Sequence, residues 1–306
     1  MKTLLKKALY QFKSYPIPSS YNLQLGYIFH TEMVFNDKMF KDLLHFCSEF
    51  KAITGTQPIC TVMSGVSPKV ADGMRQHKCE DKKLADRYHE LGGFATLGYH
   101  GHFYLNPALF KRKEAEIRSN NFSKQNLKEQ FTRDLEWFSS HNLPHNGLYA
   151  AGWWFMNQHL LAMLIEAGFA YDFSFSKHIH FRNQFSHKLM LENELRAGEP
   201  FEITIPGQGS IKEIQNLTGS PSTPHFQDFT RNLLHILDPS QPRVTGVINS
   251  HDYDLDLKNT LLLFRNLEKL SNVSFFDANQ LLDKRLNLSY KPVSLSSTLF
   301  EGPSLT

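Results

Sequence analysis

The sequence lacks the features of a membrane, secreted or nucleic-acid-binding protein. Its 306 residues contain no apolar run of the roughly 20 residues that a membrane-spanning helix needs. Lys and Arg total 33 and Asp and Glu total 30, and this near-balance predicts no nucleic-acid partner. The cysteines, Cys47, Cys60 and Cys79, are odd in number and lack CxxC spacing, which indicates free thiols in a reducing compartment. Because the N-terminus has no secretory signal, we predict a cytoplasmic protein.

Several catalytic motifs are also missing. There is no nucleophile elbow, zinc-protease helix or phosphate-binding glycine loop. Asp252-Tyr-Asp254 matches the Asp-x-Asp that holds a metal–nucleotide diphosphate in glycosyltransferases, although short acidic patterns are common in loops that begin a helix. An EF-hand is excluded because Leu257 occupies the position of the required glycine. A glycosyltransferase therefore stays open as a minor alternative.

The composition suits a globular protein with a large core. Hydrophobic residues make up 41% and charged residues 21%, and the length fits one α/β barrel. We predict an N-terminal extension over residues 1–20, a barrel domain over 21–285 and a tail over 286–306. Apolar residues at helical spacing between lysines in 1–13 predict an amphipathic helix. That helix either contacts an anionic membrane surface or packs on its own domain.

Strand-like and helix-like segments alternate along the chain. Predicted strands cover 23–30, 58–63, 147–152, 171–176, 201–206, 243–250 and 273–276, and the segment 96–106 is predicted as a further strand with its exit loop. The first predicted helix is capped by Asn36 or Asp37, and its core face consists of Phe40, Leu43, Leu44, Cys47 and Phe50. Further predicted helices cover 81–91, 124–140, 156–167, 226–237 and 258–270. Residues 177–197 lack periodicity, which predicts an insertion or long loop. This alternation predicts parallel strands joined by crossover helices in one domain.

Two histidines stand at the end of the third predicted strand. In Thr96-Leu-Gly-Tyr-His100-Gly-His102, the two rings are separated by one glycine. Residues at i and i+2 of an extended segment point to the same face, so both rings converge. Neutral imidazoles in this arrangement are typical ligands of a divalent metal. The alternative is a chance pair, since the chain has 15 histidines.

Other polar and aromatic side chains occur where predicted strands end. In an α/β barrel the carboxyl ends of the strands form the active-site face. The candidates there are His30, Glu32, His100, His102, Trp153, Trp154, His251 and Asp252. Glu32 with the two histidines makes a three-ligand set that leaves positions open for water and substrate. His251 is then a candidate acid–base group, unless it is an ordinary hydrogen-bonded strand-end histidine.

Taken together, residues 23–283 resemble the polysaccharide deacetylase (NodB homology) family, similar to carbohydrate esterase family 4. The segments that carry the resemblance occur in family order: Phe29-His-Thr-Glu32, then 85–93 with Leu97-Gly-Tyr-His100-Gly-His102, then 149–161 with 166–174, then Val247-Ile-Asn-Ser-His251. The third of these is the most specific, because both halves fall at the expected separation. The resemblance implies a distorted β/α barrel and a metal-dependent hydrolase that removes acetyl groups from the amino sugars of a glycan.

The resemblance also implies individual roles. Glu32 and His100 match metal-ligand positions, and His251 matches the acid that protonates the leaving amine. The implied cofactor is a divalent metal, zinc by preference, and the implied partner is a carbohydrate. Trp153 and Trp154 are candidate sugar-stacking residues, with core packing as the alternative for one of them.

Three positions depart from the family pattern. His30 stands where the family has its base aspartate, and Ala150 where an arginine orients that base. Tyr104 stands where the second ligand histidine is usual, so His102 must substitute, and Tyr104 becomes a candidate substrate contact. His30 serves either as a general base or as a fourth metal ligand. The sequence therefore leaves open an active deacetylase and a catalytically degenerate relative that binds a glycan or a protein partner.

Overall fold

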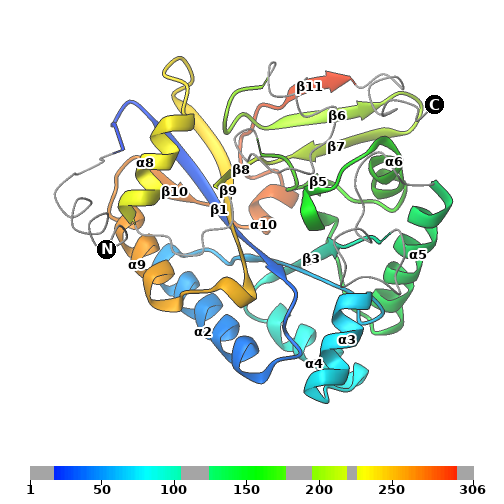
Figure 1. The fold of residues 1–306 in the computed structure, drawn as a ribbon. Helices are drawn as coiled ribbons and strands as arrows, with labels where there is room; N and C mark the ends of the chain where they lie inside the picture. The colour runs from blue at the N-terminus through cyan, green and yellow to red at the C-terminus, as the bar shows by residue number, and fades with distance from the viewer. Residues whose placement is uncertain (1–16, 105–123, 177–194, 219–225, 295–306) are drawn as a thin grey trace, which may run out of the picture.

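The computed structural model describes residues 17–104, 124–176, 195–218 and 226–294 (Figure 1). Within these ranges no helix combines the length and apolarity of a membrane span. The predicted amphipathic helix of residues 1–13 lies outside the described residues, as does most of the predicted insertion at 177–197. The amphipathic helix and the insertion therefore stay predictions.

An eleven-stranded, mostly parallel sheet forms the centre of the molecule and curls into a half-barrel (Figure 1). The strand order is β11-β6-β7-β5-β4-β3-β2-β1-β9-β8, with β10 also paired to β1, and only β6–β7 is antiparallel. The strands are β1 Asn22–Thr31, β2 Ile59–Val62, β3 Thr96–Gly101, β4 Leu148–Ala151, β5 Tyr171–Asp172, β6 Phe201–Ile205, β7 Gly209–Glu213, β8 Asn216–Thr218, β9 Arg243–His251, β10 Val273–Phe275 and β11 Lys291–Ser294. The predicted distorted β/α barrel is confirmed.

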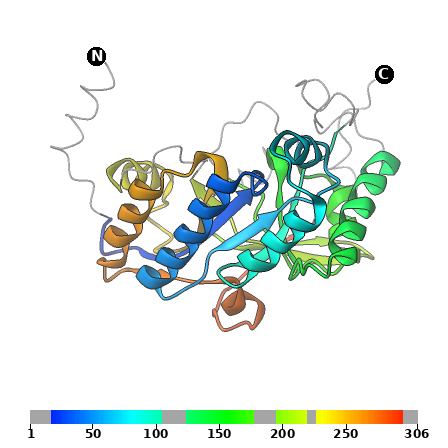
Figure 2. The same cartoon turned by 90° about the horizontal axis from the view of Figure 1, so that it is seen from below.

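Helices cover the outer face of this sheet, and α9, α2, α4 and α5 lie side by side along it (Figure 2). The helices are α2 Asp37–Thr54, α3 Pro68–His77, α4 Asp81–Gly92, α5 Lys124–Ser140, α6 Gln158–Glu166, α8 Phe226–Ile236, α9 Leu257–Glu268 and α10 Ala278–Leu282. Short 3₁₀ turns η3 Gly152–Trp154 and η4 Asp252–Asp254 follow β4 and β9. Both turns therefore stand at the carboxyl edge of the sheet.

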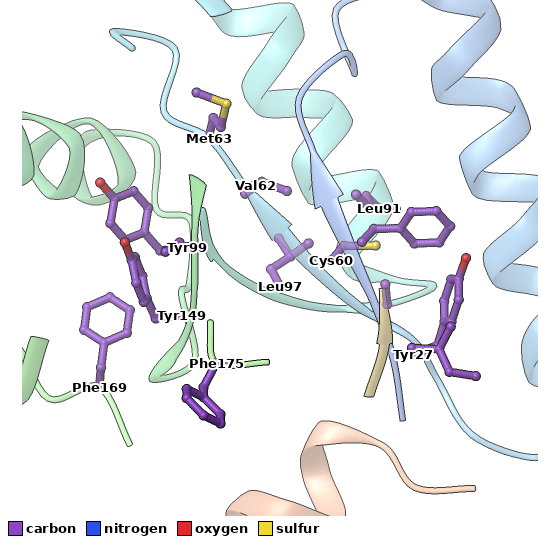
Figure 3. Close-up of a cluster of buried hydrophobic side chains, with 14 of the residues drawn as sticks. Tyr27, Cys60, Val62, Met63, Leu91, Leu97, Tyr99, Tyr149, Phe169 and Phe175 are labelled. Atoms are coloured by element: carbon purple, nitrogen blue, oxygen red, sulfur yellow. The ribbon is translucent and has the colours of Figure 1, made fainter. Parts of the chain in front are cut away.

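Aromatic side chains fill the layer between the helices and the sheet. The ring of Tyr27 lies 5.1 Å from that of Phe46 and 4.9 Å from that of Phe264, so residues of β1, α2 and α9 pack together. Farther along the sheet, Tyr99, Tyr149 and Phe169 make a second group (Figure 3). Tightly packed interiors of this kind hold the strands in fixed register. The positions of the strand ends are thereby fixed as well.

The opposite, concave face of the sheet is apolar at its base. Ile28 of β1 and Val247 of β9 pack there with Phe276, and Ala278 and Leu281 of α10 belong to the same cluster. Because side chains alternate along a strand, the residues two and four positions further along these strands face the same side. That places His30 and His251 on the concave face, above the apolar base.

Local signals explain where α2 begins and ends. The Asn36 side chain accepts hydrogen bonds from the backbone amides of Lys38 and Met39 at 3.0 and 3.2 Å, which confirms the predicted cap. The helix ends at Gly55, whose φ of 74° is the left-handed conformation that glycine adopts without steric cost. Among the predicted core residues of α2, Leu44 is only partly buried, and Phe46 is buried although it was not predicted.

Several elements differ from the sequence-based prediction, and β7, β8 and α10 were not predicted at all. The Gly, Ser and Pro-rich segment after β2 contains α3, whose buried face is only Val70 and Gly73 and therefore too small for a clear apolar period. Residues 171–176 contribute only a two-residue strand. The segment predicted as a tail contributes β11, which pairs with β6. The domain boundaries at 20 and 285 are otherwise untested.

Candidate metal centre

Three strands bring the predicted polar residues to one edge of the sheet. In the parallel register, His30 of β1 pairs with His251 of β9 on one side and with Thr61 of β2 on the other. His100 lies in β3, and Glu32 is the first residue beyond β1. Because parallel strands end at the same edge, these side chains meet although they are far apart in the sequence.

The ligand atoms of Glu32, His100 and His102 lie within 4.8 Å of one another, and all three residues are buried. Glu32 Oε1 is 3.3 Å from His100 Nε2 and 3.0 Å from His102 Nε2, and the two Nε2 atoms are 3.1 Å apart. The three residues therefore form a possible metal site. This is the set that the sequence predicted.

The hydrogen bonds of His100 test whether a cation fits there. Its Nδ1 lies 2.8 Å from the carbonyl oxygen of Ala150, which can only accept, so Nδ1 carries the proton. Burial lowers the pKa of His100 and of His102 well below the usual histidine value, so both rings are neutral. The Nε2 lone pair of His100 therefore points at a carboxylate oxygen. A cation between them would turn this repulsion into coordination, so the donor set fits a divalent metal.

The carboxylate of Asp252 holds the backbone that carries Glu32. It accepts hydrogen bonds from the amide of Glu32 at 3.0 Å and from the amide of Met33 at 2.7 Å. Asp252 is buried, and burial raises its pKa to about 7 despite these bonds. The sequence placed Asp252 at a strand end, but its structural role depends on a contact between residues 220 positions apart.

Lys69 of α3 is a component of the site that the sequence did not predict. Its Nζ forms an ion pair with Glu32 Oε2, the oxygen that faces away from the histidines, and lies 5.3 Å from the centre of the Tyr253 ring. The Lys69 side chain is 32% exposed, whereas that of Glu32 is 2% exposed. The only signal in the sequence is Ser67-Pro68, a typical helix start that would place Lys69 in a first turn.

His30 lies beside the three ligands but does not belong to them. Its ring centre is 4.6 Å from that of His100 and 5.2 Å from that of His251. Burial is the largest cause that lowers its pKa well below the usual value, followed by His100. His30 Nε2 is buried and has no hydrogen-bond partner among the described residues. The nearby side-chain amide of Asn249 on β9, which the sequence did not single out, is likewise buried without a partner in this part of the chain.

His251 stands on the other side of the cluster. Its Nε2 is 3.9 Å from Glu32 Oε1 and its Nδ1 is 3.6 Å from Asp254 Oδ2. Burial, followed by the nearby His100, lowers the pKa of His251 to about 4, while Asp254 acts in the opposite direction. Asp254 therefore favours the protonated form of this ring.

Two consecutive tryptophans follow β4 in a strained turn. Trp153 and Trp154 have φ of 58° and 56°, the left-handed region that large side chains rarely adopt. Trp153 is 41% exposed and its ring lies 5.9 Å from that of His102, whereas Trp154 is buried against His30. Trp153 is thus placed to contact a ligand, and Trp154 packs in the core. Strain of this kind is common at ligand-binding sites.

Tyr104 and Tyr253 differ in their exposure to solvent. Tyr104, a predicted substrate contact, is 2% exposed and its ring lies 6.4 Å from that of His102, nearly parallel to it. In this structure the Tyr104 ring packs beside His102, one of the three candidate metal ligands. Its contact with a substrate stays a prediction. Tyr253 is 40% exposed and its ring stacks on that of His251 at 4.7 Å, and it was not among the predicted site residues.

Comparison with solved structures agrees with this architecture. A protein from Mycobacterium smegmatis described as a polysaccharide deacetylase aligns over 92% of this chain and 97% of its own, with a TM-score of 0.54 and 14% identity. The 4-alpha-glucanotransferase from Thermococcus litoralis aligns over 90% of this chain and 42% of its own, with a TM-score of 0.50 and 11% identity. No protein-family model and no curated protein matches the sequence. The chain therefore has the fold of polysaccharide deacetylases, and at such identities the similarity concerns the fold alone.

Proposed function

We propose that the protein is a metal-dependent deacetylase acting on N-acetylated amino sugars of a glycan or a glycan precursor. One observation carries the proposal: Glu32, His100 and His102 converge at the carboxyl edge of a half-barrel with the deacetylase fold. Two imidazoles and one carboxylate are a common ligand set of hydrolytic zinc, which leaves positions for water and substrate. We place the reaction in the cytoplasm.

The metal, when bound, would polarise the acetyl carbonyl and lower the pKa of bound water. The residues of the chain supply the rest. The Ala150 carbonyl accepts a hydrogen bond from His100 Nδ1, which leaves the Nε2 lone pair free to bind a metal. The Asp252 carboxylate accepts a hydrogen bond from the backbone amide of Glu32 and so holds that residue in place. Fixed ligands of this kind set the geometry of the site before the substrate arrives.

His30 is our candidate for the group that accepts a proton from the attacking water. Its nitrogens do not belong to the three-residue ligand group, which favours a base over a fourth ligand. Burial keeps the ring neutral, and its Nε2 has no competing partner among the described residues. A general base contributes about 10²–10⁴-fold in rate.

His251 is our candidate for the acid at the leaving nitrogen. Amide cleavage requires a proton at that nitrogen, and His251 is near Glu32 but outside the ligand set. Burial lowers the pKa of His251 to about 4, and Asp254 beside Nδ1 opposes that shift, so it increases the share of the imidazolium form that donates the proton. Trp153, exposed next to His102, offers an apolar surface for a sugar ring.

A binding protein without turnover is the second candidate. Ala150 and Tyr104 stand where the resembling family has an arginine and a histidine, and both are buried here. The glycosyltransferase alternative is weaker, because Asp252 is engaged by two backbone amides and Asp254 by His251. In that arrangement the two carboxylates are not jointly directed at a nucleotide-bound metal.

Acetate release separates the two main candidates. N-acetylated sugars, nucleotide sugars and short glycans would be incubated with the protein and added zinc. We expect turnover by the native chain, a loss of about 10²–10⁴-fold for His30→Ala, and no loss for His45→Ala, an exposed histidine on α2. A His30→Asp and Ala150→Arg double variant should raise turnover. If the native chain and this variant release no acetate but still bind glycans, the deacetylase proposal is wrong.

A further inference from the structure

Glu32 needs a counter-charge even when no metal is bound. Its side chain is 2% exposed, and an ionised carboxylate buried without a partner is strongly destabilising. Among ion pairs between described residues, Lys69 is the only lysine or arginine that contacts Glu32. Lys69 therefore neutralises Glu32 in the metal-free site.

The two oxygens of Glu32 are divided between these partners. Oε1 faces His100 and His102 at 3.3 and 3.0 Å, and Oε2 faces Lys69. A divalent ion at Oε1 and the Lys69 ammonium at Oε2 would share one carboxylate, within a few ångströms of each other. At such separations, and in a partly buried site, the repulsion between a dication and a monocation is large.

We propose that Lys69 is a resident cation that competes with the divalent metal for Glu32. This proposal rests on the metal site of the proposed function, but it concerns metal affinity and not turnover. Lys69 can give way because its side chain is 32% exposed and its Nζ is already 5.3 Å from the Tyr253 ring, where a cation–π contact is available. Lys69 thus lowers the affinity for metal while protecting the metal-free protein from a buried, unpaired carboxylate.

Zinc titration of three variants tests the proposal. Lys69→Met removes the charge and keeps the length of the side chain, whereas Lys69→Arg keeps the charge. Lys82→Met is the matched control, because Lys82 also pairs with a carboxylate, Asp86, but on the exposed surface of α4. The zinc dissociation constant would be measured by competition with a chromophoric chelator. The melting temperature of each protein would be measured with and without zinc.

We expect Lys69→Met to bind zinc at least about tenfold more tightly than the native chain, and Lys69→Arg to stay within about threefold of it. Without zinc, Lys69→Met should melt at a lower temperature than the native chain. Added zinc should raise its melting temperature by more than it raises that of the native chain. Lys82→Met should match the native chain. Equal or weaker zinc binding by Lys69→Met, or none at all, would overturn the proposal. None of these outcomes depends on acetate release, so failure here is distinct from failure of the deacetylase assignment.

Discussion

The Asp252 carboxylate accepts a hydrogen bond from the backbone amide of Glu32 at 3.0 Å, although 220 residues separate the two in the chain. This bond joins the end of β9 to the end of β1. It fixes the backbone from which the candidate metal-binding carboxylate extends. The geometry of the metal site is therefore coupled to the closure of the sheet between its first and ninth strands.

Replacing Asp252 should consequently affect stability and metal binding together. Asp252→Ala leaves the buried amides of Glu32 and Met33 without their acceptor, so we expect a loss of about 2–4 kcal/mol in the free energy of unfolding. Zinc affinity should fall in parallel. Asp86→Ala, which removes an exposed carboxylate on α4, should change stability by less than about 0.5 kcal/mol. Urea unfolding would measure the stability of both variants. Equal stability of the two would contradict the prediction.

His100 provides the direct test of the metal site. If its Nε2 is a ligand, His100→Ala should lose stoichiometric zinc, because only Glu32 and His102 remain of the three donors. Elemental analysis of the purified protein, or equilibrium dialysis with zinc, measures this content. His45→Ala changes an exposed histidine and should keep the native content. Full metal content in His100→Ala would exclude this ligand set.

Gly152 leaves the space that the His102 ring occupies. A Cβ atom at this position would lie 2.3 Å from His102 Cδ2, well inside van der Waals contact. We expect Gly152→Ala to displace the ring and weaken zinc binding by at least about tenfold, since metal geometry tolerates only small ligand shifts. Gly92→Ala is the control, because its Cβ would meet Leu97 at an ordinary 3.6 Å. Zinc affinities that agree between the two variants would argue against this role for Gly152.

Trp153 should contribute more to ligand binding than to stability. Its left-handed backbone costs about 1–3 kcal/mol, which glycine would relieve, while Trp153→Gly loses the contact with His102. We expect the free energy of unfolding to change by less than about 1 kcal/mol because these effects offset each other. Glycan affinity should fall by up to about tenfold. Phe94→Ala removes an equally exposed aromatic ring at the amino end of β3 and should leave binding unchanged.

Asp134 should make stability depend on pH. Its buried carboxylate accepts hydrogen bonds from the hydroxyls of Ser64 and Tyr99, and burial raises its pKa from 3.8 to about 6. The folded protein then binds more protons than the unfolded chain between these values, so this residue lowers stability as pH rises from about 4 to 6. The shift corresponds to roughly 3 kcal/mol.

Asp134→Asn cannot titrate, so this part of the pH dependence should disappear. The measurement is the free energy of unfolding of both proteins in urea at several values between pH 4 and pH 7. The free energy of unfolding of Asp134→Asn, relative to that of the native chain, should increase as the pH rises. The buried histidines contribute equally to both curves and cancel. Parallel curves would show that Asp134 ionises normally in the folded protein.

Much of this fold could be predicted from the sequence because its signals are local. Apolar periodicity predicted α5 over its full length, and of the two predicted caps of α2, Asn36 and Asp37, the structure shows Asn36. The strands that hold His30, His100 and His251 were predicted close to their observed limits. Elements whose stability depends on tertiary packing were missed. Helix α3 buries only one small face, and β11 is a strand only because β6 lies beside it.

The sequence by itself determined the three candidate metal ligands. The i, i+2 spacing puts His100 and His102 on one face, and Glu32 follows an apolar strand, so all three reach the carboxyl edge of any parallel sheet built from these strands. Only the tertiary structure decided the surroundings of that site. The pairing of Lys69 with Glu32, the Asp252 bond to the Glu32 amide and the burial of Tyr104 each depend on strand order and on long-range packing. Contacts of this kind leave no periodic pattern in the sequence, because they join elements whose positions are set by the core as a whole.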